Sequence, residues 1–100
     1  MIILRLRLHS RSDRSTELGE ALAAVVGPAR AIPGVITFDI GRDLTDPDVY
    51  IATEVFEDRA ARDRQEALPQ VASVMALLPQ AIAGPPEMAV YETADAAVAS

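Results

Sequence analysis

The chain has 100 residues, a formal net charge of −6, and an apolar half that contains 18 alanines but only four aromatic residues; this length fits one small domain. It has no cysteine, no lysine and a single histidine, His9, which excludes disulfides, thiolate zinc sites, histidine-based metal centres and lysine Schiff-base chemistry. The acidic charge argues against a nucleic-acid partner, because such an interface needs a basic surface.

The first ten residues, MIILRLRLHS, do not form a secretory signal peptide, because arginines interrupt the apolar stretch and no small-residue cleavage site follows. No apolar run of the chain approaches the roughly 20 residues that cross a bilayer. We therefore expect a soluble, cytoplasmic protein with no membrane partner.

Strict alternation of aliphatic side chains predicts a first strand over residues 2–9. Its leucines lie on one face, and Arg5, Arg7 and His9 lie on the other. Two arginines on one strand either hold an anionic group of a ligand or extend to the rim of the sheet and pair with acids. We favour acid pairing.

An amphipathic helix follows, because apolar residues recur at helical spacing between residues 18 and 29. The polar cluster before this helix offers Ser12 and Asp13 as candidate N-caps. The Gly27-Pro28 pair is expected to weaken or end the helix, since proline removes a backbone donor; alternatively, residues 29–31 add a last turn.

The pair Pro33-Gly34 precedes a β-branched run, which predicts a second strand over residues 35–40. Residues 41–48 are rich in turn formers and predict a hairpin loop, and a third strand follows over residues 49–56. The aspartates of this loop suit ordinary turn chemistry better than a metal site.

Two short helices come next. The first begins at Asp58, a suitable N-cap, and runs to about Ala67. The second begins at Pro69, which suits a first helical turn, and is expected to stop at Pro79. A last strand is predicted over residues 88–92.

The order of these elements predicts the fold class. Strand, helix, strand, strand, helix, helix, strand favours an α+β ferredoxin-like sandwich, in which a four-stranded antiparallel sheet carries its helices on one face. We expect one domain over residues 1–93 and a disordered C-terminal tail over residues 94–100, which are small and unpatterned.

The third and fourth predicted strands carry apolar side chains on both faces. On the third strand, Val49, Ile51 and Val55 lie on one face, and Tyr50 and Phe56 lie on the other. Because the helices would cover only one face of the sheet, we expect a second copy of the chain to cover the other. The sequence therefore predicts a homodimer that buries about 1,600 Å² in total.

Two stretches of the chain carry a family resemblance. The first is IPGVITFDI at residues 32–40 with the Arg-Asp-rich hairpin after it, and the second is Glu54-x-Phe56-x-Asp58 leading into a helix. Together they resemble the antibiotic biosynthesis monooxygenase (ABM) family, with matching element order over residues 2–92. Members of this family pair ferredoxin-like subunits sheet to sheet into a dimeric α/β barrel, which agrees with the homodimer inferred from the strands.

The resemblance implies oxygenation of electron-rich aromatics, such as quinols and anthrones, without a metal or other cofactor. Family members often use an Asn, a Trp and a His around a pocket between sheet and helices. In this chain those positions fall on Arg5, Phe56 and Gln65, and the chain contains neither Asn nor Trp. The resemblance therefore supports the fold more strongly than the chemistry.

Glu54 and His9 are the candidate catalytic groups. Oxygen activation without a metal or flavin needs a substrate anion, so a base must remove a proton. Glu54 suits this role if burial raises its pKa; alternatively it is an ion-paired strand carboxylate with Arg5 or Arg7 as partner. Histidine has a suitable ordinary pKa, but the position of His9 at a strand end favours an exposed or loop-bonded side chain.

The predicted substrate pocket involves Arg5, Phe56, Gln65 and Met75. Phe56 and Met75 would form an apolar wall, although a strand phenylalanine and a helix methionine at this spacing are often simply part of a core. Gln65 lies in a charged run, residues 59–66, that is typical of a solvated helix face.

Two functions from different classes are consistent with the sequence. The first is an ABM-like homodimer that acts as a cofactor-independent monooxygenase on quinol- or anthrone-like aromatics. The alternative is a non-catalytic module that uses the same barrel to bind a small ligand or to dock a partner. An amino-acid-binding regulatory domain and an RNA-binding sheet fit less well, the latter because the chain lacks a basic, aromatic strand motif.

Overall fold

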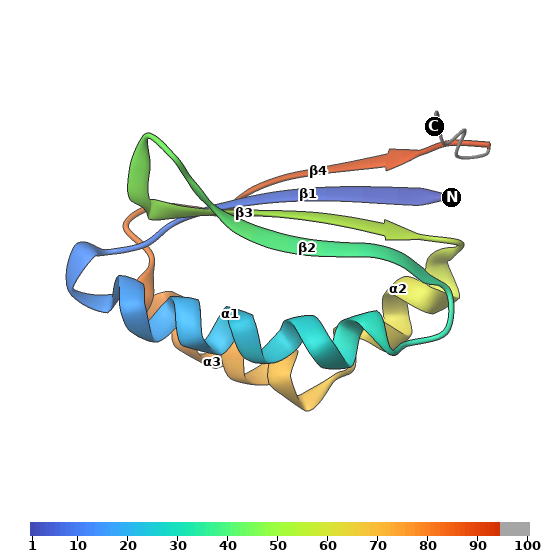
Figure 1. The fold of residues 1–100 in the computed structure, drawn as a ribbon, viewed down its shortest axis with the longest axis horizontal. Coiled ribbons are helices and arrows are strands. Elements are labelled where there is room, and N and C mark those ends of the chain that lie inside the picture. The colour runs from blue at the N-terminus through green and yellow to red at the C-terminus, as the bar shows by residue number, and fades with distance from the viewer. Residues whose placement is uncertain (95–100) are drawn as a thin grey trace.

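The computed structural model describes residues 1–94, which form a four-stranded sheet with helices on one side (Figure 1). In chain order the elements are β1 (Ile2–His9), a short 3-10 turn (Ser12–Arg14), α1 (Ser15–Arg30), β2 (Val35–Asp43), β3 (Asp46–Phe56), α2 (Arg59–Glu66), α3 (Pro69–Ala81) and β4 (Glu87–Glu92). All strand pairs are antiparallel, and the strand order is β2-β3-β1-β4. The predicted α+β ferredoxin-like sandwich is confirmed. The tail predicted to be disordered lies outside the described residues from residue 95 onward.

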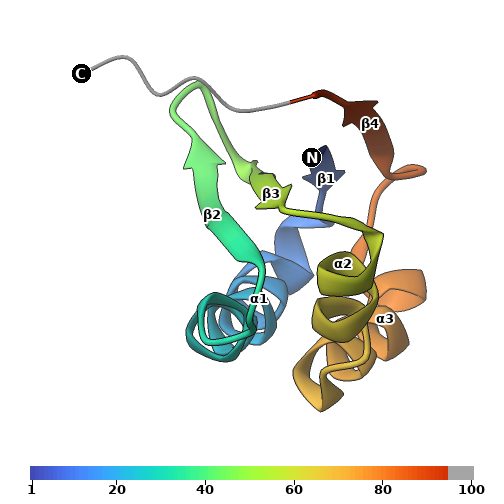
Figure 2. The same cartoon turned by 90° about the vertical axis from the view of Figure 1, so that its right-hand side faces the viewer.

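The helices lie against a single face of the sheet, and no element of residues 1–94 covers the other, open face (Figure 2). Side-chain alternation in β1 explains this division: Leu4 and Leu8 are buried on the helix side, whereas Arg5 and His9 are exposed on the open face. The larger part of the core forms where α1 crosses the sheet, around the fully buried Leu18. Within this described part of the chain, no helix is long and apolar enough to cross a membrane.

The β2–β3 hairpin has longer strands and a shorter loop than the sequence predicts. β2 continues to Asp43 and β3 begins at Asp46, which leaves a two-residue turn. The Asp43 carboxylate accepts hydrogen bonds from the backbone N–H and the hydroxyl of Thr45, at 2.8 and 2.7 Å, and the Asp46 carboxylate accepts one from the Asp48 N–H at 3.0 Å. These carboxylates therefore close the turn. Across residues 1–94, no group of three acidic or histidine side chains is placed to hold a metal ion.

The N-terminus of α1 differs from its prediction. The helix begins at Ser15, after the 3-10 turn, and has no side-chain cap, so neither Ser12 nor Asp13 serves as its N-cap. The Ser12 hydroxyl instead donates to the carboxylate of Asp48. This contact ties the start of the helical layer to β3.

Both internal prolines lie inside the last turns of their helices. α1 continues past Pro28 to Arg30, and α3 continues past Pro79 to Ala81, so the expected stop at Pro79 is wrong. Each final turn buries one alanine completely, Ala29 in α1 and Ala81 in α3. This packing outweighs the single backbone hydrogen bond that each proline removes.

Gly34 connects α1 to β2 in a conformation that favours glycine. Its φ of +88° lies in the left-handed region. Its carbonyl accepts a hydrogen bond from the Glu57 N–H at 2.8 Å, and a Cβ at this position would lie 2.7 Å from the Cβ of Ala61. Gly34 therefore lets the start of β2 lie directly against α2, the helix that carries Gln65.

Gly34→Ala is expected to lower the free energy of unfolding by about 2 kcal/mol, because a left-handed conformation costs an L-residue about 1–2 kcal/mol and the new methyl group overlaps Ala61. Gly41→Ala in β2 is the matched control, since the residue is exposed and nothing lies within 4 Å of its new Cβ. Alanine is favoured over glycine inside a strand by about 0.5–1 kcal/mol, so the control should be more stable than wild type. Urea denaturation measures both values, and effects of the same sign would contradict this account.

Candidate functional site

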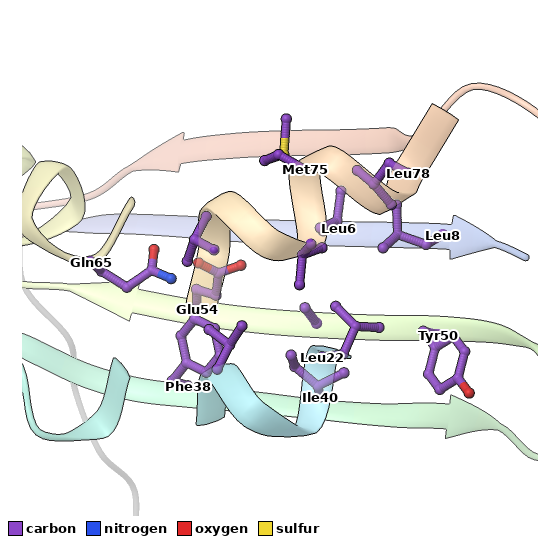
Figure 3. A pocket seen from close by; sticks show the side chains of 14 residues that line it. Leu6, Leu8, Leu22, Phe38, Ile40, Tyr50, Glu54, Gln65, Met75 and Leu78 are labelled. Carbon is purple, nitrogen blue, oxygen red and sulfur yellow. The ribbon is translucent and has the colours of Figure 1, made fainter. Parts of the chain in front are cut away.

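A cavity of about 100 Å³ lies between the sheet and helices α1 and α3, with α2 at one end (Figure 3). Twelve of its 14 lining residues are aliphatic or aromatic, and the other two are Glu54 and Gln65. Figure 3 shows Tyr50 at the end opposite Gln65. Met75 of α3 lines the cavity and is 61% exposed, so the cavity opens to solvent beside this residue.

Glu54 projects from β3 into the space between sheet and helices. Its cross-strand neighbours are Leu4 on β1 and Phe38 on β2, and the residue is only 8% exposed. Arg5 and Arg7 occupy the alternate positions of β1 and therefore point to the open face. The alternative interpretation of Glu54 as an ion-pair partner of either arginine is therefore wrong.

Burial raises the pKa of the Glu54 carboxyl from 4.5 to about 7, because desolvation disfavours its charged form. The negative charge of Glu66 also raises this pKa, and the positive charge of Arg62 lowers it. Arg62 and Glu66 are both on α2 and pair with each other at 2.8 Å. Near neutral pH Glu54 is therefore present in protonated and ionised forms, which suits a general base.

Gln65 comes from α2, whose N-terminus begins as predicted. Asp58 caps the helix by accepting a hydrogen bond from the Ala61 N–H at 2.9 Å. Ala61 and Gln65 lie four residues apart and are both buried, so they form the inward stripe of a helix that is otherwise charged. Gln65 is 3% exposed, and its interpretation as part of a solvated face is therefore wrong.

The Glu54 carboxyl and the Gln65 amide lie toward the same end of the cavity (Figure 3). Within residues 1–94, neither side chain takes part in a hydrogen bond or an ion pair with another protein group. Neither is among the fully enclosed polar atoms that lack a partner, so their polar atoms face the open space of the cavity. These two groups are therefore available to a ligand in the cavity.

The other candidate residues are separated from the cavity. Phe56 is completely buried in a second cluster of the core, Arg5 is exposed on the open face, and His9 is exposed at the end of β1. A ligand in the cavity would contact none of these three side chains. Of the predicted pocket residues, it would contact Gln65 and Met75.

Tyr50 lines the cavity although the sequence patterns do not single it out. Its hydroxyl donates to the Ser15 carbonyl at 2.8 Å and accepts from the Arg42 guanidinium at 2.7 Å. A Cβ on Gly19 would overlap this hydroxyl, so the glycine of α1 permits the close approach. Two features of the sequence could have indicated this residue: it is an aromatic residue at a β3 position that faces the helices, and the helix opposite it contains a glycine.

Comparison with known proteins supports the fold and its family. The model of the antibiotic biosynthesis monooxygenase family matches residues 1–76. Rv0793 from Mycobacterium tuberculosis has a TM-score of 0.87 at 22% identity, covering 97% of this chain and 98% of that protein. PA3566 from Pseudomonas aeruginosa has a TM-score of 0.84 at 18% identity, covering 94% of each chain. The uncharacterized protein sll1783 from Synechocystis sp. is 24% identical over 94 residues, which are 94% of this chain, and the chain spans 64% of that protein's length.

Glu54→Gln is expected to change how stability depends on pH. Because the folded-state pKa of about 7 lies above the ordinary 4.5, folding favours the protonated carboxyl. Its contribution to stability is therefore full below pH 4.5 and is lost as pH rises through about 7. For a shift of this size the loss reaches about 3 kcal/mol. The uncharged glutamine removes it, so the variant should gain stability relative to wild type between about pH 5 and about pH 8.

Urea denaturation at both pH values measures this difference. Glu17→Gln, which removes an exposed carboxyl of α1, is the matched control and should retain the pH dependence of wild type. If the free energy of unfolding of Glu54→Gln falls between these two pH values as much as that of wild type, ionisation of the Glu54 carboxyl does not destabilise the folded protein, and this account is wrong.

Proposed function

Because the chain belongs to the antibiotic biosynthesis monooxygenase family, we propose that it is a cofactor-independent monooxygenase acting on quinol- or anthrone-like aromatics. The observation that carries this proposal is the carboxyl of Glu54, which lies, without a hydrogen bond or ion pair to any of residues 1–94, in a cavity whose other lining residues, Gln65 excepted, are apolar. Such a group can accept a proton from a bound phenol or carbon acid near neutral pH. The apolar walls favour an aromatic ring.

The proposed reaction begins when Glu54 takes the proton of a quinol hydroxyl. The anion then transfers an electron to dioxygen, and recombination of the two radicals forms a peroxide at a ring carbon. Loss of water from this peroxide leaves one oxygen atom in the product, so a quinol and O₂ give a hydroxyquinone and H₂O. The Gln65 amide is neutral and cannot act as the base, but its N–H can stabilise the anion by donating a hydrogen bond to it.

A non-catalytic ligand-binding module on the same fold is the second candidate. Phe56 and Gln65 stand where the family resemblance places Trp and His, and Phe56 does not line the cavity. These differences affect positions implied in catalysis, whereas the apolar cavity itself is retained. A module of this kind would be stabilised by an aromatic ligand without consuming oxygen.

Wild-type protein is expected to consume oxygen with methylhydroquinone or anthrone at a rate that rises as pH increases through about 7, because only ionised Glu54 accepts a proton. The charged groups that act on this carboxyl are Glu66 and Arg62 of α2, while its neighbours Leu4 and Phe38 are apolar. Glu54→Gln should lower the rate above this pH by about 100-fold or more and remove the pH dependence. An oxygen electrode, with protein-free reactions subtracted, measures both effects.

His9→Gln is the matched control for this profile, because histidine ordinarily titrates near neutral pH and His9 is exposed outside the cavity. It should retain the rate and the profile of wild type. An increase in Tm on adding the aromatic compound, without oxygen consumption, would favour the binding module. No turnover of either compound by the folded protein would remove the monooxygenase proposal.

We also propose that the protein is a homodimer whose sheets pack through their open faces. Tyr91, Ile3 and Val55 are cross-strand neighbours on this face and form an apolar row over β4, β1 and β3. Tyr91 is 56% exposed, and the other two are only partly buried. The β2–β3 hairpin bends toward the open side of the sheet, with the fully exposed Leu44 in its turn (Figure 1). Apolar side chains gathered on an uncovered face are typical of an interface.

Val55→Asp is expected to convert the dimer into a monomer, because it places a charge in the middle of the apolar row. Ala24→Asp, at an exposed position of α1, introduces the same charge on the opposite side of the molecule and should leave the dimer intact. Sedimentation velocity at micromolar concentration measures the mass of each variant. Wild-type protein that sediments as a 10.7 kDa monomer would contradict the dimer.

A further inference from the structure

We infer that the cavity selects uncharged, single-ring phenols and excludes ring compounds that carry a carboxylate, sulfonate or phosphate group. This inference rests on the proposed function, because it specifies the substrate class of the same site. It depends on three properties of the cavity: the charges around it, its size, and the position of its two polar side chains.

The charges around the cavity disfavour an anionic ligand. Among residues 1–94, no arginine or histidine lines the cavity, and its one acidic residue is Glu54. The arginines nearby have other partners: Arg62 pairs with Glu66 at 2.8 Å, and Arg42 bonds the hydroxyl of Tyr50 with its guanidinium over the ring. An anion would therefore lose its hydration without gaining a cation, and it would face a carboxylate.

The size of the cavity leaves room for no more than one ring. Its volume is about 100 Å³, and an apolar cavity of about 150 Å³ holds a single benzene molecule, so even a single ring extends its substituents toward the open mouth beside Met75. The Tyr50 end is closed, because hydrogen bonds to Ser15 and Arg42 hold the tyrosine hydroxyl in place. A fused second or third ring would have to extend through the mouth beside Met75. Of the aromatics proposed above, single-ring quinols therefore fit better than anthrones.

The polar side chains determine how such a ring is oriented. Glu54 and Gln65 lie toward one end of the cavity (Figure 3). A phenol hydroxyl placed there can donate to the carboxylate of Glu54 while its oxygen accepts from the amide of Gln65. The other ring substituents then face aliphatic walls or the mouth beside Met75, where a methyl group is favoured and a buried charge is not.

Gentisamide and gentisate provide a matched pair of probes. They are 2,5-dihydroxybenzamide and 2,5-dihydroxybenzoate, which have the same ring, the same hydroxyls and nearly the same shape, and differ by one negative charge. Calorimetric titration without oxygen at about pH 8, where Glu54 is mostly ionised, measures both dissociation constants. Wild-type protein should bind gentisamide at least about tenfold more tightly than gentisate.

Two variants test whether charge causes this preference. Met75→Arg places a cation at the exposed mouth of the cavity and should raise the affinity for gentisate relative to that for gentisamide; Met75→Leu is its control. Glu54→Gln removes the like charge and should reduce the preference. Met75→Arg changes a solvent-exposed side chain, so it provides the test even if Glu54→Gln fails to fold.

The outcomes separate this inference from the proposed function. Equal affinities of wild type for the two probes, or a preference that Met75→Arg leaves unchanged, would overturn the inference. Oxygen consumption with gentisate would also overturn it and would leave the monooxygenase proposal standing. Selective binding of gentisamide, with no oxygen consumption with methylhydroquinone or anthrone, would support the inference and remove the monooxygenase. Binding of neither probe would overturn the inference, and oxygen consumption with methylhydroquinone or anthrone would then decide the monooxygenase proposal separately.

Discussion

The carboxyl of Glu54 lies on the helix side of β3, where an aliphatic side chain would pack without an electrostatic cost. Desolvation of this group is the constraint on which the site depends. The apolar walls of the cavity cause it, and it holds the pKa near 7 and leaves the carboxyl able to accept a proton from a ligand. The same burial that lowers stability at neutral pH therefore supplies the basicity that the proposed chemistry needs. Catalytic sites typically gain reactivity at a cost in folding stability.

Much of the fold follows from local patterns. The leucine alternation of β1, the Pro33-Gly34 pair before β2 and the Asp58 cap of α2 all agree with the structure. The errors concern tertiary packing. Pro79 does not end α3, because the burial of Ala81 holds the last turn in place. The hairpin strands extend beyond their predicted ends, because their aspartates satisfy backbone groups of the turn.

The site was only partly accessible to sequence reasoning. Gln65 was selected through the family resemblance and Glu54 through the need for a base, and both line the cavity. Arg5 and Phe56 lie outside the cavity for different reasons: Arg5 is opposite the leucines of β1, and Phe56 shares the helix side with Glu54 but packs in the second cluster of the core. Because β3 is apolar on both faces, alternation alone does not show which of its faces meets the helices. The strand register resolves this point: Glu54 faces Leu4 and therefore lies on the opposite side of the sheet from Arg5. Neither the resemblance nor the spacing indicates how far α3 stands from the sheet, which determines the cavity volume.

The anchoring of Tyr50 has a consequence for how this pocket could diverge. Its hydroxyl donates a hydrogen bond to Ser15 of α1 and accepts one from Arg42 of β2. The hydroxyl already lies directly against Gly19 of α1. That wall can move only if two secondary-structure elements move with it. Descendants of this protein that accommodate bulkier compounds would therefore acquire their substitutions on α3, near Met75, and would keep the tyrosine end unaltered.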